Sequence, residues 1–306
     1  MSLYELLIEP LSYGFMQRAL LTALAAGIVC ALLSCWLVLI GWSLMGDAVS
    51  HAVLPGVVLA YLVGAPFAIG AAIAGFAAVG LIGAIHQTSR IKEDAAIGIV
   101  FTTLFAGGLV LISVTPSQTD LQHIVFGNVL GVSAGDLIQV LAISAVVALV
   151  VWLKHRDFTL YAFDANHAAA LGLRPRLIGA LLLGLLAVTA VAALQVAGVV
   201  LVVAMLIIPG ATARLLTTRM SRMLLIAPLV SIGATLVGIY ASYWLDTATG
   251  ASIVVVQGAC FLAVWLFAPR GGLVGGALAR LRAARGNATS DSEQGDPTAA
   301  QESAAS

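Results

Sequence analysis

The sequence predicts an all-α polytopic membrane protein, and three observations lead to that fold class. First, 61% of its 306 residues are hydrophobic and only 9% are charged, whereas soluble proteins carry about 25% charged residues. Second, the chain contains nine apolar runs, most of them close to the roughly 20 residues that a helix needs to cross a bilayer. Third, Lys and Arg are concentrated in alternate connections between these runs. The chain therefore belongs in a lipid bilayer, and its net charge of zero gives no indication of nucleic-acid binding.

The apolar runs define the candidate transmembrane helices in chain order. The second and seventh runs are short, and we expect them to be interrupted by the proline in "LPG" (54–56) and in "IPG" (208–210). Eight spans remain an alternative if the first region of the chain folds differently. The nine runs cover residues 19–41, 48–64, 66–86, 95–114, 136–153, 177–194, 198–215, 223–243 and 251–268.

The positions of Lys and Arg indicate which connections face the cytoplasm, because short cytoplasmic loops carry an excess of them. The intervening connections, such as "DTATG" (246–250), contain none. Nine spans with the N-terminus outside and the C-terminus in the cytoplasm satisfy this pattern, with Arg18 as the lone exception; eight spans with both ends inside are the alternative. The basic segments are 89–94, 153–176, 214–222 and 270–285.

Two segments flank the predicted membrane region, 19–268. Residues 1–18 are mixed in character and lack the basic start of a cleavable signal peptide, so we expect an interfacial segment. Residues 269–306 begin with several arginines and end in small polar residues. We expect this segment to be a cytoplasmic tail, basic at first and disordered towards its end.

The longest predicted cytoplasmic connection, about 154–176, contains a polar stretch that reads as a helix, "FDANHAAALGLRPR" (163–176). Asp164 or Asn166 can cap this helix, and Gly172 can end it. A structured amphipathic piece between two spans indicates a docking element for another protein. An ordinary interfacial helix explains the same pattern equally well.

Asp47 and His51 form the candidate metal site in "MGDAVSHAVLPG" (45–56). A charged group in the bilayer centre costs about 2.5–3.5 kcal/mol on insertion scales, so it needs a partner or a wet cavity. Residues four apart share a helix face, which directs an oxygen and a nitrogen ligand towards one point. Such ligands suit Mn²⁺, Fe²⁺ or Zn²⁺. The alternative is an Asp–His pair whose two side chains only bond to each other inside the bundle and bind no metal.

Pro55 and Pro209 mark the two interrupted runs. A broken helix at membrane depth frees backbone carbonyl groups, which are tolerated where protein or a water-filled cavity receives them. By analogy with secondary transporters, paired interruptions of this kind indicate helix breaks that line the transport pathway. A simple packing kink is the alternative at both prolines.

No catalytic residue is predicted. The sequence has no "GK" pair, and therefore no Walker A loop to bind the phosphates of ATP, and it lacks HExxH and GxSxG motifs. We expect the chain not to be an enzyme and to hold no permanent cofactor. Energy for uphill transport would have to come from a partner chain or an ion gradient.

Several blocks resemble the manganese/zinc/iron class of ABC-transporter permeases. The signature-like segment is "MGDAVSHAVLPGVVLAYLVG" (45–64), followed in the expected order by segments at 92–113, 120–137, 163–176, 196–217 and 246–256. The similarity extends over roughly residues 11–268. "IKEDAAIGIVF" and "HIVFGNVLGVS" look more like manganese or manganese/iron members than zinc members.

The resemblance implies a type II ABC importer permease in a bacterial plasma membrane, working as a homodimer. It implies two copies of a separate cytoplasmic ATPase and an extracellular or periplasmic metal-binding lipoprotein as partners. It places the family's transient metal contacts on Asp47 and His51 and its ATPase-docking helix on the 163–176 segment. The transported ion would be Mn²⁺, ahead of Zn²⁺ or Fe²⁺. The expected docking residues are Phe163, Asp164, His167, Leu171 and Gly172.

Two other functions remain open from the sequence. A proton-coupled secondary carrier could use the same Asp47–His51 pair without any ATPase. An ABC permease for a metal chelate, such as a siderophore or cobalamin, would keep the architecture but would not need a charged ligand pair.

Overall fold

Nine helical segments are long and apolar enough to cross a membrane within residues 9–114 and 129–268, the part of the chain that this computed structural model describes. This confirms the nine predicted spans. The predicted tail at 269–306 and the first eight residues of the predicted interfacial segment lie outside the described residues. The first helix, α2 (Gly14–Ile40), begins before the run expected from residue 19. It includes Arg18, whose Nε donates to the carbonyl of Gly14 one turn earlier.

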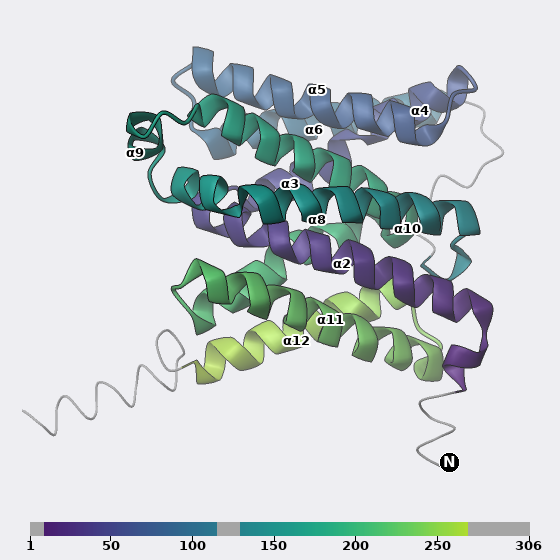
Figure 1. Cartoon of the computed structure of the whole chain (residues 1–306). Coiled ribbons are helices and arrows are strands. Elements are labelled where there is room, and N and C mark those ends of the chain that lie inside the picture. Colours follow the sequence, from purple (N-terminus) through teal and green to yellow (C-terminus); the bar gives the residue numbers. More distant parts are fainter. Residues whose placement is uncertain (1–8, 115–128, 269–306) are drawn as a thin grey trace, which may run out of the picture.

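The remaining spans follow in chain order and cross the bundle alternately in opposite directions (Figure 1). Short turns join most of them; Gly41, with φ of +92°, ends α2 by a left-handed residue that suits glycine. The elements are η1 (Pro10–Ser12), α3 (Ser43–Ala52), α4 (Leu54–Leu62), α5 (Phe67–Thr88), α6 (Glu93–Val114), η2 (Val129–Gly131), α8 (Ala134–Phe163), α9 (Ala165–Ala170), α10 (Pro175–Leu216), α11 (Met220–Leu245) and α12 (Thr249–Phe267).

Helices α2 and α10 form the centre of the bundle. The α2 helix packs against α8, α10 and α11, and it buries Trp36 and Leu33 completely. The Trp36 ring meets Phe158 of α8 edge-on, with ring centroids 5.6 Å apart. By contrast, α5, α6, α8 and α12 expose large apolar side chains on their outer faces, such as Ile73 and Val255. A bilayer accounts for such an exposed apolar girdle.

The basic connections all lie at one end of the bundle, which we name the basic end. Every described Lys and Arg except Arg18 lies there, in or beside the α5–α6, α8–α10 and α10–α11 connections. Figure 1 shows α9 at this end, on the left of the view, and the beginning of α2 at the opposite end. This arrangement agrees with the alternation of charged and uncharged connections along the sequence.

The two predicted interruptions differ in the structure. The first is present: α3 ends at Ala52, and α4 begins at Leu54 with Pro55 in its first turn, where a missing N–H costs no helical hydrogen bond. The predicted break at Pro209 was wrong, because α10 continues through that residue. The non-helical residue inside α10 is Gly198 (φ 73°, ψ 165°), at the start of the seventh span.

The "IPG" sequence lies inside α10 at a close contact with α2. A Cβ atom added at Gly210 would lie 2.6 Å from Ser34 Oγ and 2.5 Å from the Ser34 carbonyl oxygen of α2. Gly210 therefore allows the close packing of the two central helices. Proline removes one helical hydrogen bond, yet both neighbouring turns keep their helical conformation.

Candidate metal site and docking helix

The candidate metal site lies on α3, where Asp47 and His51 contact each other across one helical turn. His51 Nδ1 lies 3.2 Å from Asp47 Oδ1 and 3.0 Å from the Asp47 carbonyl oxygen. A carbonyl oxygen only accepts, so Nδ1 carries the proton in this hydrogen bond. The neutral ring then keeps the lone pair on Nε2, the atom through which such a histidine binds a divalent metal.

Two aromatic rings of α6 fix the other faces of the imidazole. Phe101 and Phe105 both meet the His51 ring nearly edge-on, with centroid distances of 5.1 and 5.2 Å. They lie four residues apart and so share one face of α6. Sequence reasoning did not single them out, although the i, i+4 spacing of two aromatics was a usable signal. The imidazole is therefore held on three sides by its own chain.

The pair is only partly covered by this chain: 33% of the Asp47 side chain and 24% of the His51 side chain are exposed. The neighbouring Ser50 differs, because it is buried on the packed side of α3. His51 lies eight residues after the start of α3, which at about 1.5 Å per residue is about 12 Å into the span. The pair thus reaches towards the middle of a hydrocarbon core that is about 30 Å thick.

The structure brings Asp47 and His51 together but adds no third ligand. Among the residues that the structure describes, no cluster of three or more His, Cys, Asp or Glu side chains could hold a metal ion. The described residues of one chain supply two ligands, whereas Mn²⁺, Fe²⁺ or Zn²⁺ takes four or more ligands. Ligands from water or from another chain would have to complete a site here.

The segment expected to dock an ATPase forms a short helix, α9 (Ala165–Ala170), at the basic end. Asp164 caps it, with Oδ1 accepting from the backbone N–H of Asn166 at 2.9 Å and of His167 at 3.0 Å. Of the two caps considered from the sequence, Asp164 is the one used. Gly172 has φ of +85°, and its N–H donates to the carbonyl of Ala169. A left-handed residue of this kind strains any side chain other than glycine.

The α9 helix is anchored on one side and open on the other. Ala168 is fully buried against the bundle, and α9 packs against the ends of α8 and α10. Phe163 and Leu171, on either side of the helix, are 60% and 62% exposed. Large apolar side chains in a connection between spans, with their faces open, indicate a surface for another protein.

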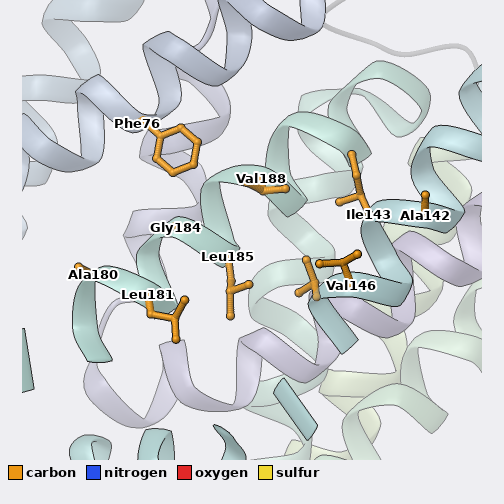
Figure 2. Close-up of a pocket in the computed structure, with 10 residues that line it drawn as sticks. Phe76, Ala142, Ile143, Val146, Ala180, Leu181, Gly184, Leu185 and Val188 are labelled. Carbon is orange, nitrogen blue, oxygen red and sulfur yellow. The ribbon is translucent and has the colours of Figure 1, made fainter. Parts of the chain in front are cut away.

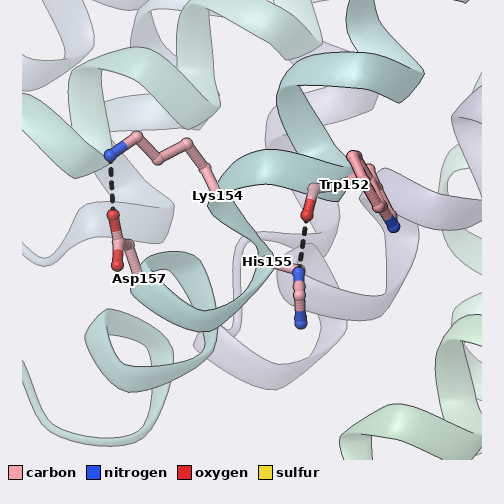
Figure 3. Close-up of polar contacts among 4 residues, drawn as sticks. All are labelled: Trp152, Lys154, His155 and Asp157. Atoms are coloured by element: carbon pink, nitrogen blue, oxygen red, sulfur yellow. Dashed lines mark hydrogen bonds and ion pairs between the residues drawn. The ribbon is translucent and has the colours of Figure 1, made fainter.

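Polar contacts near the end of α8 are satisfied within that helix. His155 Nδ1 donates to the carbonyl of Trp152 at 2.7 Å, and Lys154 Nζ lies 2.9 Å from Asp157 Oδ2 (Figure 3). His155 therefore makes a local backbone contact and stands apart from the Asp47–His51 pair.

The comparison with known proteins identifies the family. Residues 12–268 match the ABC 3 transport family. The chain belongs to that family. A membrane protein of Haemophilus influenzae named as a probable iron transport system component is 53% identical, over 85% of this chain and 96% of its own length. The manganese transport system membrane protein MntB of Synechocystis is 49% identical, over 88% of each chain.

A solved structure supports the same membership at the level of the fold. PsaBC from Streptococcus pneumoniae, in complex with Fab, aligns with a TM-score of 0.80 and 38% identity, over 88% of this chain and 98% of that one. The present chain is thus a multi-pass permease subunit of a bacterial ABC transporter. ATP hydrolysis belongs to the ATPase partner of such a complex, which agrees with the missing Walker A loop.

Proposed function

We propose that this permease imports a divalent transition metal ion, with Mn²⁺ preferred over Zn²⁺ and Fe²⁺, and that Asp47 and His51 bind the ion in transit. The observation that carries the proposal is the geometry of the pair: Nδ1 is engaged by the Asp47 backbone, which leaves Nε2 and the carboxylate as ligands. Similarity to proteins named for manganese and iron transport supports this class of ion.

We infer that the permease works as a homodimer with the pair near its two-fold axis. Asp47 and His51 are partly exposed in the single chain, and lipid is a costly neighbour for a carboxylate. A second copy would cover this face and would bring an identical Asp–His pair to the first. Two such pairs supply four protein ligands, which is enough for a weak, transient site.

Energy for import comes, in this proposal, from an ATPase that docks at α9. The basic end is the cytoplasmic end, where the positive-inside tendency places Lys and Arg. Phe163 and Leu171 provide the exposed apolar contact, while Asp164 and Gly172 define the shape of the helix. His167 lies on the same helix and is exposed. Closure of the ATPase dimer would move α9, and with it α8 and α10.

At the opposite end, a metal-binding lipoprotein would deliver the ion. The ion would pass between the two chains, be held briefly by the two Asp–His pairs, and leave at the basic end. Pro55 lies in the first turn of α4, just beyond the pair, so the α3–α4 break would lie next to the pathway. Pro209 is buried within α10; its contribution to the pathway would be indirect, through the packing of α10 on α2.

The Mn, Fe and Zn contents of cells test the proposal when all three are measured together. A strain that lacks this chain should be depleted chiefly in Mn, and the native chain should restore it. The Asp47→Ala/His51→Ala chain should not restore it, whereas His155→Ala should, because His155 lies away from the pair. Full restoration by the Asp47→Ala/His51→Ala chain would favour a permease for a metal chelate.

A further inference from the structure

An apolar groove opens on the outside of the bundle between α5 and α8, with α10 as its floor (Figure 2). Its cavity volume is about 410 Å³, within the usual range for small-molecule sites of about 300–1,000 Å³. Phe76 of α5 forms one wall, and Ile143 and Val146 of α8 form the other. The lining residues are all aliphatic, aromatic or glycine, and they belong to three membrane spans.

Gly184 lines the floor of this groove and, because it has no side chain, leaves the space above α10 open. A Cβ atom there would lie 3.6 Å from Phe76 Cε1, an ordinary contact distance. A larger side chain at this position would therefore extend into the groove without striking the backbone. Ala180, Gly184 and Val188 follow at intervals of four residues along α10 and so form one continuous stripe on its face.

The contents of the groove follow from its position. Water is a poor occupant, because apolar cavities stay dry unless several polar groups can hold the water. The groove lies within membrane spans and reaches the outer surface, where Leu181 and Val146 are exposed. The bilayer supplies hydrocarbon at this surface, and a single lipid acyl chain could lie along the apolar stripe of α10.

Basic side chains near one end of the groove favour a lipid with an anionic headgroup. Arg176 is exposed and precedes Ala180 by four residues, so it extends the α10 stripe by one turn at the basic end. Lys154 follows Val147 of the groove by seven residues and remains 53% exposed beside Asp157 (Figure 3). Trp152, two residues before Lys154 on α8, is 70% exposed, as is common for tryptophan at the headgroup level.

We propose that this groove binds one acyl chain of an anionic phospholipid from the leaflet at the basic end, with Arg176 holding the lipid phosphate. Arginine suits this role because its planar guanidinium forms paired hydrogen bonds with phosphate oxygens. Lys154 shares its charge with Asp157 and contributes to the attraction of the headgroup. The bound lipid would fill the space between α5 and α8, two helices that both pack on α10.

Native mass spectrometry of the full-length permease tests the proposal after reconstitution in vesicles of equal phosphatidylglycerol and phosphatidylcholine. The native chain should retain phosphatidylglycerol in preference to phosphatidylcholine, and excess inorganic phosphate should not displace it. Gly184→Leu should fill the groove and lose the retained lipid. Gly233→Leu is the matched control on α11, because a Cβ at Gly233 meets nothing within 4 Å.

Arg176→Gln separates the headgroup from the acyl chain. This variant should still retain lipid but should lose the preference for phosphatidylglycerol, and it leaves the groove and the packing of α10 unchanged. Equal retention of phosphatidylglycerol by the native chain and by Gly184→Leu would overturn the proposal. A change in oligomeric mass with Gly184→Leu would also overturn it, since a second copy of the chain would then be the occupant.

Discussion

At the scale of single residues, the proposed metal binding depends on how the His51 imidazole is held. The Asp47 carbonyl fixes the proton on Nδ1, and Phe101 and Phe105 fix the ring plane. A ring that is oriented in advance loses little freedom when a metal arrives. Because only two ligands would come from one chain, the proposed site would bind the ion weakly enough for it to leave.

Protonation of His51 should compete with the metal. An unperturbed imidazole titrates near pH 6.5, and the imidazolium form has no lone pair for a ligand bond. Uptake by the native chain should therefore fall as the external pH drops towards about 6. In His51→Gln, uptake should be roughly 10–100-fold lower, by analogy with losses at metal sites, and its pH profile should be flat over this range. A profile of unchanged shape in His51→Gln would exclude the ligand role.

The contacts of the ring predict a smaller effect at Phe101. Edge-to-face aromatic pairs contribute about 0.5–1.5 kcal/mol each. Phe101→Leu keeps the apolar volume but removes this contact, so metal uptake should fall by several-fold at low ion concentration and recover at saturation. Phe76→Leu on α5 is a control, because Phe76 lies in the groove away from His51. Equal behaviour of the two variants would mean that the ring contacts do not orient His51.

At the scale of elements, small residues let helices approach closely. A Cβ at Gly56 of α4 would lie 2.6 Å from Ala74 Cβ of α5 and would strike the backbone at Gly70. Gly70 faces Gly56 and Ala60 in the same way. Small residues four apart on both helices are a common means of close packing in membranes. This crossing supports the short α4 helix beside the candidate metal site.

Gly56→Ala should therefore destabilise the purified protein. Overpacking of a tight contact costs about 1–3 kcal/mol, which thermal unfolding in detergent, followed by circular dichroism, would detect as a lower midpoint. Gly80→Ala in α5 is the control, because a Cβ at Gly80 has open space around it and alanine is the better helix former. A midpoint that is lower in Gly80→Ala than in Gly56→Ala would contradict this account of the α4–α5 crossing.

If the ATPase docks at α9, a charge on the exposed face of this helix should weaken the assembly of permease and ATPase. Leu171→Asp puts a charge on the exposed apolar face and should abolish co-purification of the ATPase, with the permease itself still folded. Ile91→Asp, also at an exposed position at the basic end, should bind the ATPase as the native chain does. Retention of the ATPase by Leu171→Asp would place the docking surface elsewhere.

The number of membrane spans was predictable from this sequence. Whether a proline interrupts a span was predictable at Pro55 but not at Pro209. Composition and the length of apolar runs suffice to place spans, since a bilayer imposes a fixed length. The break expected at Pro209 was wrong because α10 stays helical where it packs on α2, and Ser34, the residue that faces Gly210, is far away in sequence. The Asp47–His51 contact follows from i, i+4 spacing alone, but the Phe101 and Phe105 contacts needed the packing of α6 on α3.

At the scale of the whole molecule, the proposed homodimer joins two chains at the face that carries Asp47 and His51. Leu44 lies on this face, three residues before Asp47, and is exposed in the single chain. In a Cys260→Ser background, which removes the exposed native thiol, Leu44→Cys should cross-link two copies. Leu225→Cys, on an exposed face of α11, should cross-link far less. Equal yields would contradict a dimer with the pair near its axis.

Transport in proteoliposomes tests the central claim most directly. The permease reconstituted with its ATPase and binding lipoprotein should accumulate Mn²⁺ when ATP is supplied, and Asp47→Ala/His51→Ala should abolish accumulation without loss of the complex. The permease alone should accumulate nothing under a proton gradient. Proton-driven Mn²⁺ accumulation by the permease alone would contradict the account.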